Sequence, residues 1–114
     1  MAMELTPQQA LQLWQGTLAL ASRDGGPDLS VRQMAIMLSV YLSAPPHTVR
    51  GLAERLRISK PAVVRALDAL GELDFLRRRR DEADRRNVLI QRTVKGSVFL
   101  REFAEHIMAA SDQL

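Results

Sequence analysis

The fold of this chain is decided by the stretch from Thr48 to Arg92, which has the sequence TVRGLAERLRISKPAVVRALDALGELDFLRRRRDEADRRNVLIQR. Thr48 is placed to cap a short helix, Val49 to Leu56, whose apolar residues recur with helical spacing. Ser59 is placed to cap a second helix, with Pro61 in the first turn, where a proline loses no needed hydrogen bond. Two short helices joined by a tight connection are typical of a helix-turn-helix.

The second helix has one apolar face, formed by Val63, Ala66, Leu67 and Leu70 at helical spacing, and we expect this face to pack inward. The outward face then carries Lys60, Pro61, Ala62, Val64, Arg65 and Asp68. Because its front residues are small, such a helix can enter a DNA major groove, which is about 12 Å wide. Lys60 and Arg65 are expected to reach phosphates or guanine edges, and Ala62 or Val64 a thymine methyl group. The positive helix N-terminus at Ser59 also favours a phosphate.

A β-hairpin is predicted after this helix. The helical pattern fails near residues 71–74, and strands are expected at Phe75 to Arg79 and Val88 to Arg92, around an eight-residue linker, residues 80–87. Val88 and Ile90 are expected to pack inward, leaving the tip free to enter a minor groove, where a narrow groove attracts arginine. The hairpin arginines expected to contact DNA are Arg78, Arg80, Arg85 and Arg86.

Each of these features also has a plainer interpretation. Any amphipathic helix has a charged outer face. The six hairpin arginines can pair in part with Asp81, Glu82 and Asp84, although three carboxylates cannot neutralise all of them.

Working outward, Thr6 and Pro7 predict the start of a helix that ends near Ala21, and Ser30 predicts a cap for a helix through Leu42. That second helix is expected to turn Val31, Met34, Met37, Leu38 and Tyr41 inward. Thr93 is placed to cap a last helix to about residue 110. We therefore predict a mainly α chain with a small antiparallel β-hairpin: a single winged helix-turn-helix domain, residues 1–114, with helix-turn-helix and wing at 48–92 and flanking, dimerising helices at 7–42 and 93–110.

Charge is concentrated in one part of the chain. The segment from Arg50 to Arg101 holds 14 of the 16 basic residues and 7 of the 13 acidic ones, so it is the candidate surface for a polyanion. The chain has no cysteine, which excludes disulfides, thiolate metal sites and thiol redox chemistry. No signal segment and no apolar run of about 18 residues is present, so we expect a cytoplasmic protein without a membrane partner.

An enzyme is not expected. His47 and His106 are the only histidines, and neither lies in a catalytic or metal-binding motif, so we predict no catalytic residues, metal or cofactor. Met34, Met37 and Met108 are more typical of core filling than of an effector cavity. Trp14 is more typical of a packing or dimer contact than of a ligand platform.

The same residues resemble the multiple antibiotic resistance regulator (MarR) family of bacterial transcription factors. Leu52-Ala-Glu-Arg-Leu56 and Ile58-Ser-Lys-Pro-Ala-Val-Val-Arg-Ala-Leu67 look like the family's helix-turn-helix. Arg80-Asp-Glu-Ala-Asp-Arg-Arg86, Val88-Leu-Ile90 and Thr93-Val-Lys-Gly96 are similar to its wing signature. One departure is Asp74, where the family usually has a glycine at the bend between recognition helix and strand.

The resemblance implies a homodimeric repressor on a pseudo-palindromic operator, with a small molecule as its possible effector. It implies that Lys60, Ala62, Val64 and Arg65 contact the major groove, that Arg86 enters the minor groove and that Asp84 steadies this arginine. The alternative is a winged helix that serves as a protein-interaction module, whose basic hairpin binds an acidic protein.

Overall fold

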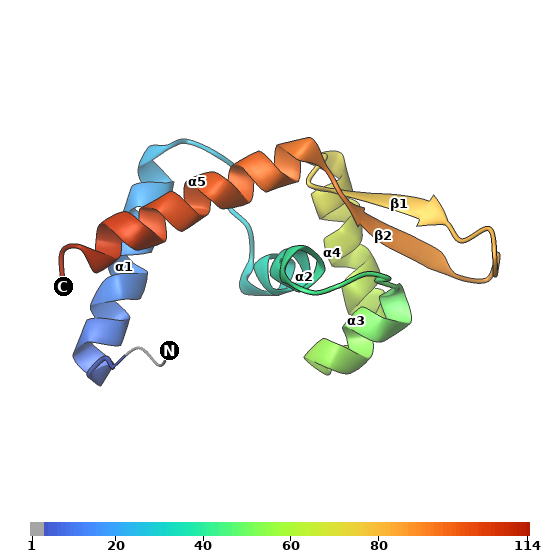
Figure 1. Cartoon of the computed structure of the whole chain (residues 1–114), viewed down its shortest axis with the longest axis horizontal. Helices are drawn as coiled ribbons and strands as arrows, with labels where there is room; N and C mark the ends of the chain where they lie inside the picture. The colour runs from blue at the N-terminus through green and yellow to red at the C-terminus, as the bar shows by residue number, and fades with distance from the viewer. Residues whose placement is uncertain (1–3) are drawn as a thin grey trace. The chain divides into compact units, whose positions relative to one another are not determined.

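The computed structural model describes residues 4–114 and contains, in this part of the chain, five helices and one β-hairpin (Figure 1). The elements are α1 (Pro7–Arg23), α2 (Val31–Leu42), α3 (Val49–Leu56), α4 (Lys60–Glu72), β1 (Leu76–Arg80), β2 (Val88–Arg92) and α5 (Val94–Ser111). This order confirms the predicted fold class. Among residues 4–114, none of the helices combines the length and the apolar character that crossing a bilayer requires.

The chain forms two compact units. The winged unit is Leu29–Val98, and the flanking unit comprises the described residues up to Asp28 together with Phe99–Leu114. Helix α5 begins in the winged unit and continues into the flanking unit. The single domain spanning residues 1–114 stays a prediction.

The helices begin at the capping residues that the sequence predicts. Each cap side chain accepts a hydrogen bond from a backbone N–H three residues later, at 2.9–3.2 Å, in the pairs Thr6–Gln9, Ser30–Gln33, Thr48–Gly51, Ser59–Ala62 and Thr93–Gly96. These bonds satisfy N–H groups that have no partner within the helix.

The core of the winged unit joins α2, α3 and α4. On α2 the buried residues are Ile36, Met37 and Val40, so the predicted inward face is partly wrong. Val31 is 86% exposed, because it occupies the first turn of α2, whereas the second and third turns face the core. On α4 the predicted face is confirmed: Val63, Ala66, Leu67 and Leu70 are all buried.

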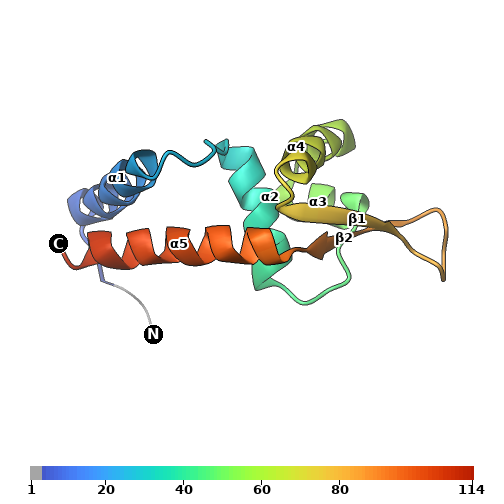
Figure 2. The ribbon, with the colours of Figure 1, turned by 90° about the horizontal axis from the view of Figure 1, so that it is seen from above.

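The wing is an antiparallel hairpin in which Leu76 pairs with Arg92 and Arg80 pairs with Val88 (Figure 2). Strand β1 therefore begins and ends one residue later than predicted, and the predicted linker is too long by one residue, because Arg80 belongs to the strand. Ile90 is buried as expected, but Val88 is 37% exposed, because it lies at the outer end of the hairpin, beyond the core.

The hairpin tip, residues 81–87, has hydrogen bonds of its own. The Asp81 N–H donates to the Asn87 carbonyl oxygen at 3.1 Å, and the Asn87 N–H donates to the Asp84 carbonyl oxygen at 2.9 Å. The Asp81 carboxylate also accepts from the Ala83 N–H at 3.0 Å. The turn is thus held by contacts among neighbours in sequence.

The base of the wing is fastened to the residues around α2 and α3. The Ile90 N–H donates to the His47 carbonyl oxygen at 2.8 Å, beside an isolated bridge between Thr48 and Leu89. Arg92 donates to the carbonyl oxygens of Val40, at 3.1 Å, and Ser43, at 3.0 Å, at the C-terminus of α2. A cation at a helix C-terminus satisfies free carbonyl groups and the helix dipole together.

A second attachment lies where β2 meets α5. The Tyr41 hydroxyl lies 2.7 Å from the Phe75 carbonyl oxygen, to which it donates, and accepts from the Thr93 N–H at 3.0 Å. A Cβ at residue 96 would collide with this hydroxyl and with the Phe75 carbonyl oxygen, so this position requires glycine. Asp74 has a φ of 59°, the left-handed conformation that a glycine adopts readily and that aspartate tolerates.

In the flanking unit, aromatic rings join α1 to the C-terminal part of α5. The Trp14 and Phe103 ring centroids are 6.2 Å apart, and those of Phe99 and Phe103 are 6.4 Å apart. His106 Nε2 lies 2.5 Å from an Asp24 carboxylate oxygen. The large apolar side chains that stay exposed on this unit include Leu11, Trp14, Leu18, Ile107 and Met108.

Candidate nucleic-acid interface

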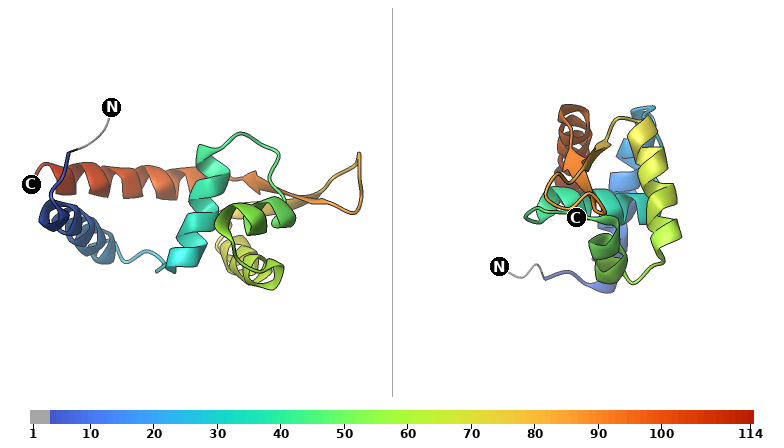
Figure 3. Two further views of the ribbon diagram at one scale, coloured as in Figure 1. Left: turned by 90° about the horizontal axis from the view of Figure 1, so that it is seen from below. Right: turned by 90° about the vertical axis from the view of Figure 1, so that its right-hand side faces the viewer.

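The turn between α3 and α4 sets the position of the predicted recognition helix. Arg57 ends α3 in the left-handed conformation, with a φ of 55°, and its N–H bonds to the Ala53 carbonyl oxygen. The Ile58 N–H donates to the same oxygen at 3.1 Å, which closes a tight turn before Ser59. Figure 3 shows the short connection that leads from α3 into α4.

The outward face of α4 holds most of the residues predicted for it. Lys60, Pro61, Val64, Arg65 and Asp68 are exposed. Their contacts with DNA stay predictions.

Ala62 is an exception. It is only 5% exposed, and the prediction that it lies on the outward face is wrong. Ala62 comes four residues before the buried Ala66, so the helical repeat places both on the inner side of α4. A thymine contact by Ala62 is therefore not available in this structure.

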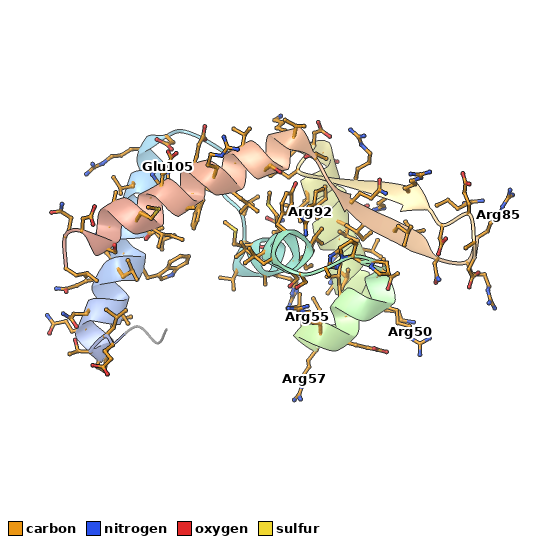
Figure 4. All side chains as sticks on the ribbon, in the orientation of Figure 1. Arg50, Arg55, Arg57, Arg85, Arg92 and Glu105 are labelled. Atoms are coloured by element: carbon orange, nitrogen blue, oxygen red, sulfur yellow. The ribbon has the colours of Figure 1, made fainter. Side chains whose placement is uncertain are left out.

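Basic residues that the sequence analysis did not single out lie on α3 and its C-terminal end. Arg50, Arg55 and Arg57 are exposed, and Figure 4 shows them projecting from this part of the helix-turn-helix. Arg50 pairs with Glu54 through an exposed contact of 3.3 Å. The excess of basic residues between Arg50 and Arg101 indicated that such exposed arginines exist. The helical periodicity of α3 did not indicate which residues they are.

The arginines of the wing extend into solvent. Arg77, Arg79, Arg80 and Arg85 are exposed, and Arg85 projects from the hairpin tip in Figure 4. Within residues 4–114, Arg80 and Arg85 have no ion-pair partner. Their positive charge is therefore available to a ligand.

Arg86 is held by Asp84, as the resemblance implies. The Asp84 carboxylate accepts from the backbone N–H and from Nε of Arg86, both at 3.1 Å, and from its Nη2 at 3.3 Å. The hydrogen bond from the Arg86 side chain, followed by that from its backbone, lowers the pKa of Asp84 below the usual aspartate value. The side chain of Arg86 is nevertheless 90% exposed, so the pair orients this arginine without burying it.

Arg78 differs from its neighbours. Its Nη2 lies 2.5 Å from Oδ1 of Asp68 and 3.3 Å from the carbonyl oxygen of Val64, both on α4. No motif or spacing in the sequence indicates this contact, because it depends on how β1 lies beside α4.

An open groove of about 610 Å³ lies beside the inner edge of α4, in the winged unit. It is lined by residues of α2, of the end of α3, of the turn that follows and of α4, including Val31, Arg32, Leu56, Ile58, Ala62 and Arg65. Among residues 4–114, no cluster of three or more potential metal ligands occurs.

Comparison with known proteins identifies the family. The sequence model of the MarR family matches residues 29–88, which is just over half of the chain. The chain belongs to the MarR family. MarR-family proteins are DNA-binding transcriptional regulators, so the predicted functional class is confirmed. No curated protein sequence matches the chain.

Solved structures of MarR-family regulators have the same fold. CouR from Rhodococcus jostii RHA1, bound to p-coumaroyl-CoA, is 25% identical and has a TM-score of 0.66, with 91% of this chain and 70% of that one covered. CouR bound to a 23-mer DNA duplex has a TM-score of 0.73 at 23% identity, covering 93% and 72%. A mutant MarR from E. coli, complexed with operator DNA, has a TM-score of 0.70 at 21% identity, covering 93% and 70%.

Proposed function

We propose that this MarR-family protein is a repressor that binds a pseudo-palindromic operator as a homodimer. Each protomer places α4 in the major groove and the wing tip in the adjacent minor groove. The observation that carries this proposal is the placement of both basic elements in one compact unit, residues 29–98, with their charged side chains exposed.

In the major groove, the proposed contacts come from the front of α4. Lys60 and Arg65 supply hydrogen-bond donors for phosphates or guanine edges, and Val64 supplies a methyl surface for thymine. Ser59 and Pro61 lie at the helix start, where the positive end of the helix dipole favours a phosphate.

In the minor groove, the proposed contacts come from Arg80, Arg85 and Arg86. A narrow minor groove concentrates negative potential, and a guanidinium group that is already oriented loses less entropy on entering it. The hydrogen bonds between Asp84 and Arg86 provide this orientation.

The proposed dimer rests on the flanking unit. Leu11 and Met108 are 71% and 67% exposed, and Trp14 and Leu18 are also exposed. Exposed large apolar residues on neighbouring helices are typical of an interface with another chain. Two half-sites about one helical turn apart require two wings and hence two protomers.

A small-molecule effector is part of the proposal. CouR, a relative of the same fold, has been solved with p-coumaroyl-CoA bound, and here an open groove reaches Arg65 on α4. A ligand there would compete directly with DNA for this side chain.

The proposed repressor is a cytoplasmic protein without enzymatic activity. His47 contacts the Ser43 carbonyl oxygen and His106 contacts the Asp24 carboxylate, so both rings are engaged in structural contacts. Neither arrangement pairs a base with a nucleophile.

The experiment that tests the proposal is selection of duplexes bound by the purified protein from a random pool. We expect enrichment of a pseudo-palindrome, preferred over random duplex by about a thousandfold or more, and binding that weakens steeply with salt. No duplex binding at low salt would overturn the proposal, and binding of an acidic protein instead would favour the interaction-module alternative. Light scattering that finds only monomer at micromolar concentration would overturn the dimer.

A further inference from the structure

One arginine of the wing is bonded to the recognition helix itself. Arg78 of β1 donates through Nη2 to the Asp68 carboxylate and to the Val64 carbonyl oxygen, 10 and 14 residues away in sequence. Asp68 lies on the outward face of α4, and its side chain is 58% exposed, compared with 40% for Arg78. The contact therefore joins the two DNA-binding elements at their surface.

The strand register explains why Arg78 reaches α4. Side chains alternate between the two faces of a strand, so Arg78 points to the same face as Leu76, which is buried. Arg78 also pairs across the hairpin with Ile90, which is buried as well. Arg77 and Arg79 point to the opposite face.

The charges make a phosphate contact by Arg78 unfavourable. If Arg78 turned to a phosphate, it would leave an unpaired carboxylate on the helix face that enters the groove, close to the polyanion. Like charges at such a surface repel and oppose binding. With Arg78 in place, Asp68 is neutralised and the negative charge is screened from DNA.

We propose that Arg78 is a positioning residue, which braces the wing against the recognition helix through Asp68 and makes no DNA contact of its own. This inference rests on the proposed function and replaces the DNA contact expected for Arg78 from the sequence. The brace fixes the angle between α4 and the hairpin. This angle determines which base pairs of the minor groove the wing tip contacts when α4 is bound in the major groove.

The sharpest test is Asp68→Asn, because the two roles of Arg78 predict opposite signs. If the pair is a brace, this variant weakens binding to the selected operator, by about twofold to fivefold, although it removes a negative charge from the DNA-binding face. If Arg78 contacts phosphate, the same variant frees the arginine and strengthens binding. Stronger or unchanged binding by Asp68→Asn would therefore overturn the inference.

A second set of variants uses Arg78 itself. Arg78→Ala is expected to weaken operator binding without changing the log-log salt slope, and the exchange of Arg78→Asp combined with Asp68→Arg is expected to restore most of the loss. A salt slope lower by about one unit for Arg78→Ala, the signature of a lost phosphate contact, would contradict the brace. Arg79→Ala is the matched control, because it removes the same charge from the opposite face of β1.

A measurement on the free protein separates this inference from the proposed function. Amide relaxation by NMR should show larger motions of residues 81–87 in Arg78→Ala and Asp68→Asn than in Arg79→Ala. Equal wing motions in all three variants would overturn the brace, whether or not the wild type binds DNA. Failure of the wild type to bind any duplex would overturn only the proposed function.

Discussion

The Asp84 carboxylate bonds both the guanidinium group and the backbone N–H of Arg86, two residues further along the wing tip. The Asp84 side chain thus stabilises both the backbone turn at the wing tip and the orientation of the Arg86 side chain. Because the pair is exposed, it adds little to folding stability. In the proposed complex, the pair orients the Arg86 side chain for the minor groove.

Replacing Arg86 with alanine should weaken operator binding by about 1 to 3 kcal/mol, because a minor-groove or phosphate contact is lost. Fluorescence anisotropy with a labelled operator measures this change. Arg101→Ala, which removes the same charge from a residue outside the winged unit, should bind nearly as the wild type does. Equal affinities for Arg86→Ala and wild type would remove Arg86 from the interface.

The Asp84–Arg86 pair should also be visible in a titration. Since the pKa of Asp84 is lowered by Arg86, the pair is intact above the ordinary aspartate value of about 4 and is lost as the pH falls through the lower value in the folded protein. Carboxyl chemical shifts should report this low midpoint. In Arg86→Ala the midpoint should rise, and an unchanged midpoint would show that another group causes the shift.

Gly96→Ala should destabilise the protein by about 1 to 3 kcal/mol, because the new methyl group would collide with the Tyr41 hydroxyl and the Phe75 carbonyl oxygen. Gly71→Ala is the control. It lies in α4 with nothing within 4 Å of the added Cβ, and should be neutral or stabilising by up to about 1 kcal/mol. Chemical denaturation compares the two, and similar stabilities would contradict the packing described at α5.

Tyr41→Phe should lower the free energy of unfolding by about 1 to 3 kcal/mol, since it removes the hydrogen bonds that the Tyr41 hydroxyl makes with the Phe75 carbonyl oxygen and the Thr93 N–H. Ser39→Ala removes a hydroxyl from the same helix, but one that bonds only to the Ala35 carbonyl of its own helix. We expect the control to lose much less stability in the same denaturation experiment. A loss as large as that of Tyr41→Phe would argue against a special role for the Tyr41 hydroxyl.

The features that the sequence predicted correctly are those that depend on residues close together in the chain. The caps at Ser30, Thr48 and Ser59 depend on residues within one helical turn, so a single window of sequence contains all of the required information. The order of helices and hairpin follows from such windows, and so does the buried face of α4. At the bend before β1, Asp74 has a φ of 59°, the left-handed conformation that a glycine adopts readily.

The errors arise where packing partners decide the outcome. Ala62 lies four residues before the buried Ala66, but its small side chain does not indicate how far around the first turn of α4 the core extends. Val88 has the alternation of a core residue but lies past the end of the core. The pairing of Arg78 with Asp68 could not be predicted for the same reason, because it depends on how close β1 lies to α4 in space.

The hydrogen bonds of the hairpin tip described above all run between residues 81 and 87, whereas the base of the wing is tied to His47, Thr48 and the end of α2. The conformation of the tip thus depends on contacts within residues 81–87, and the tip is carried by strands that are bonded to the rest of the winged unit. Exchanging these seven residues for the tip of another family member should transfer minor-groove preference without disturbing the helix-turn-helix. Binding specificity can in this way diversify in one short segment, at little cost to the stability of the fold.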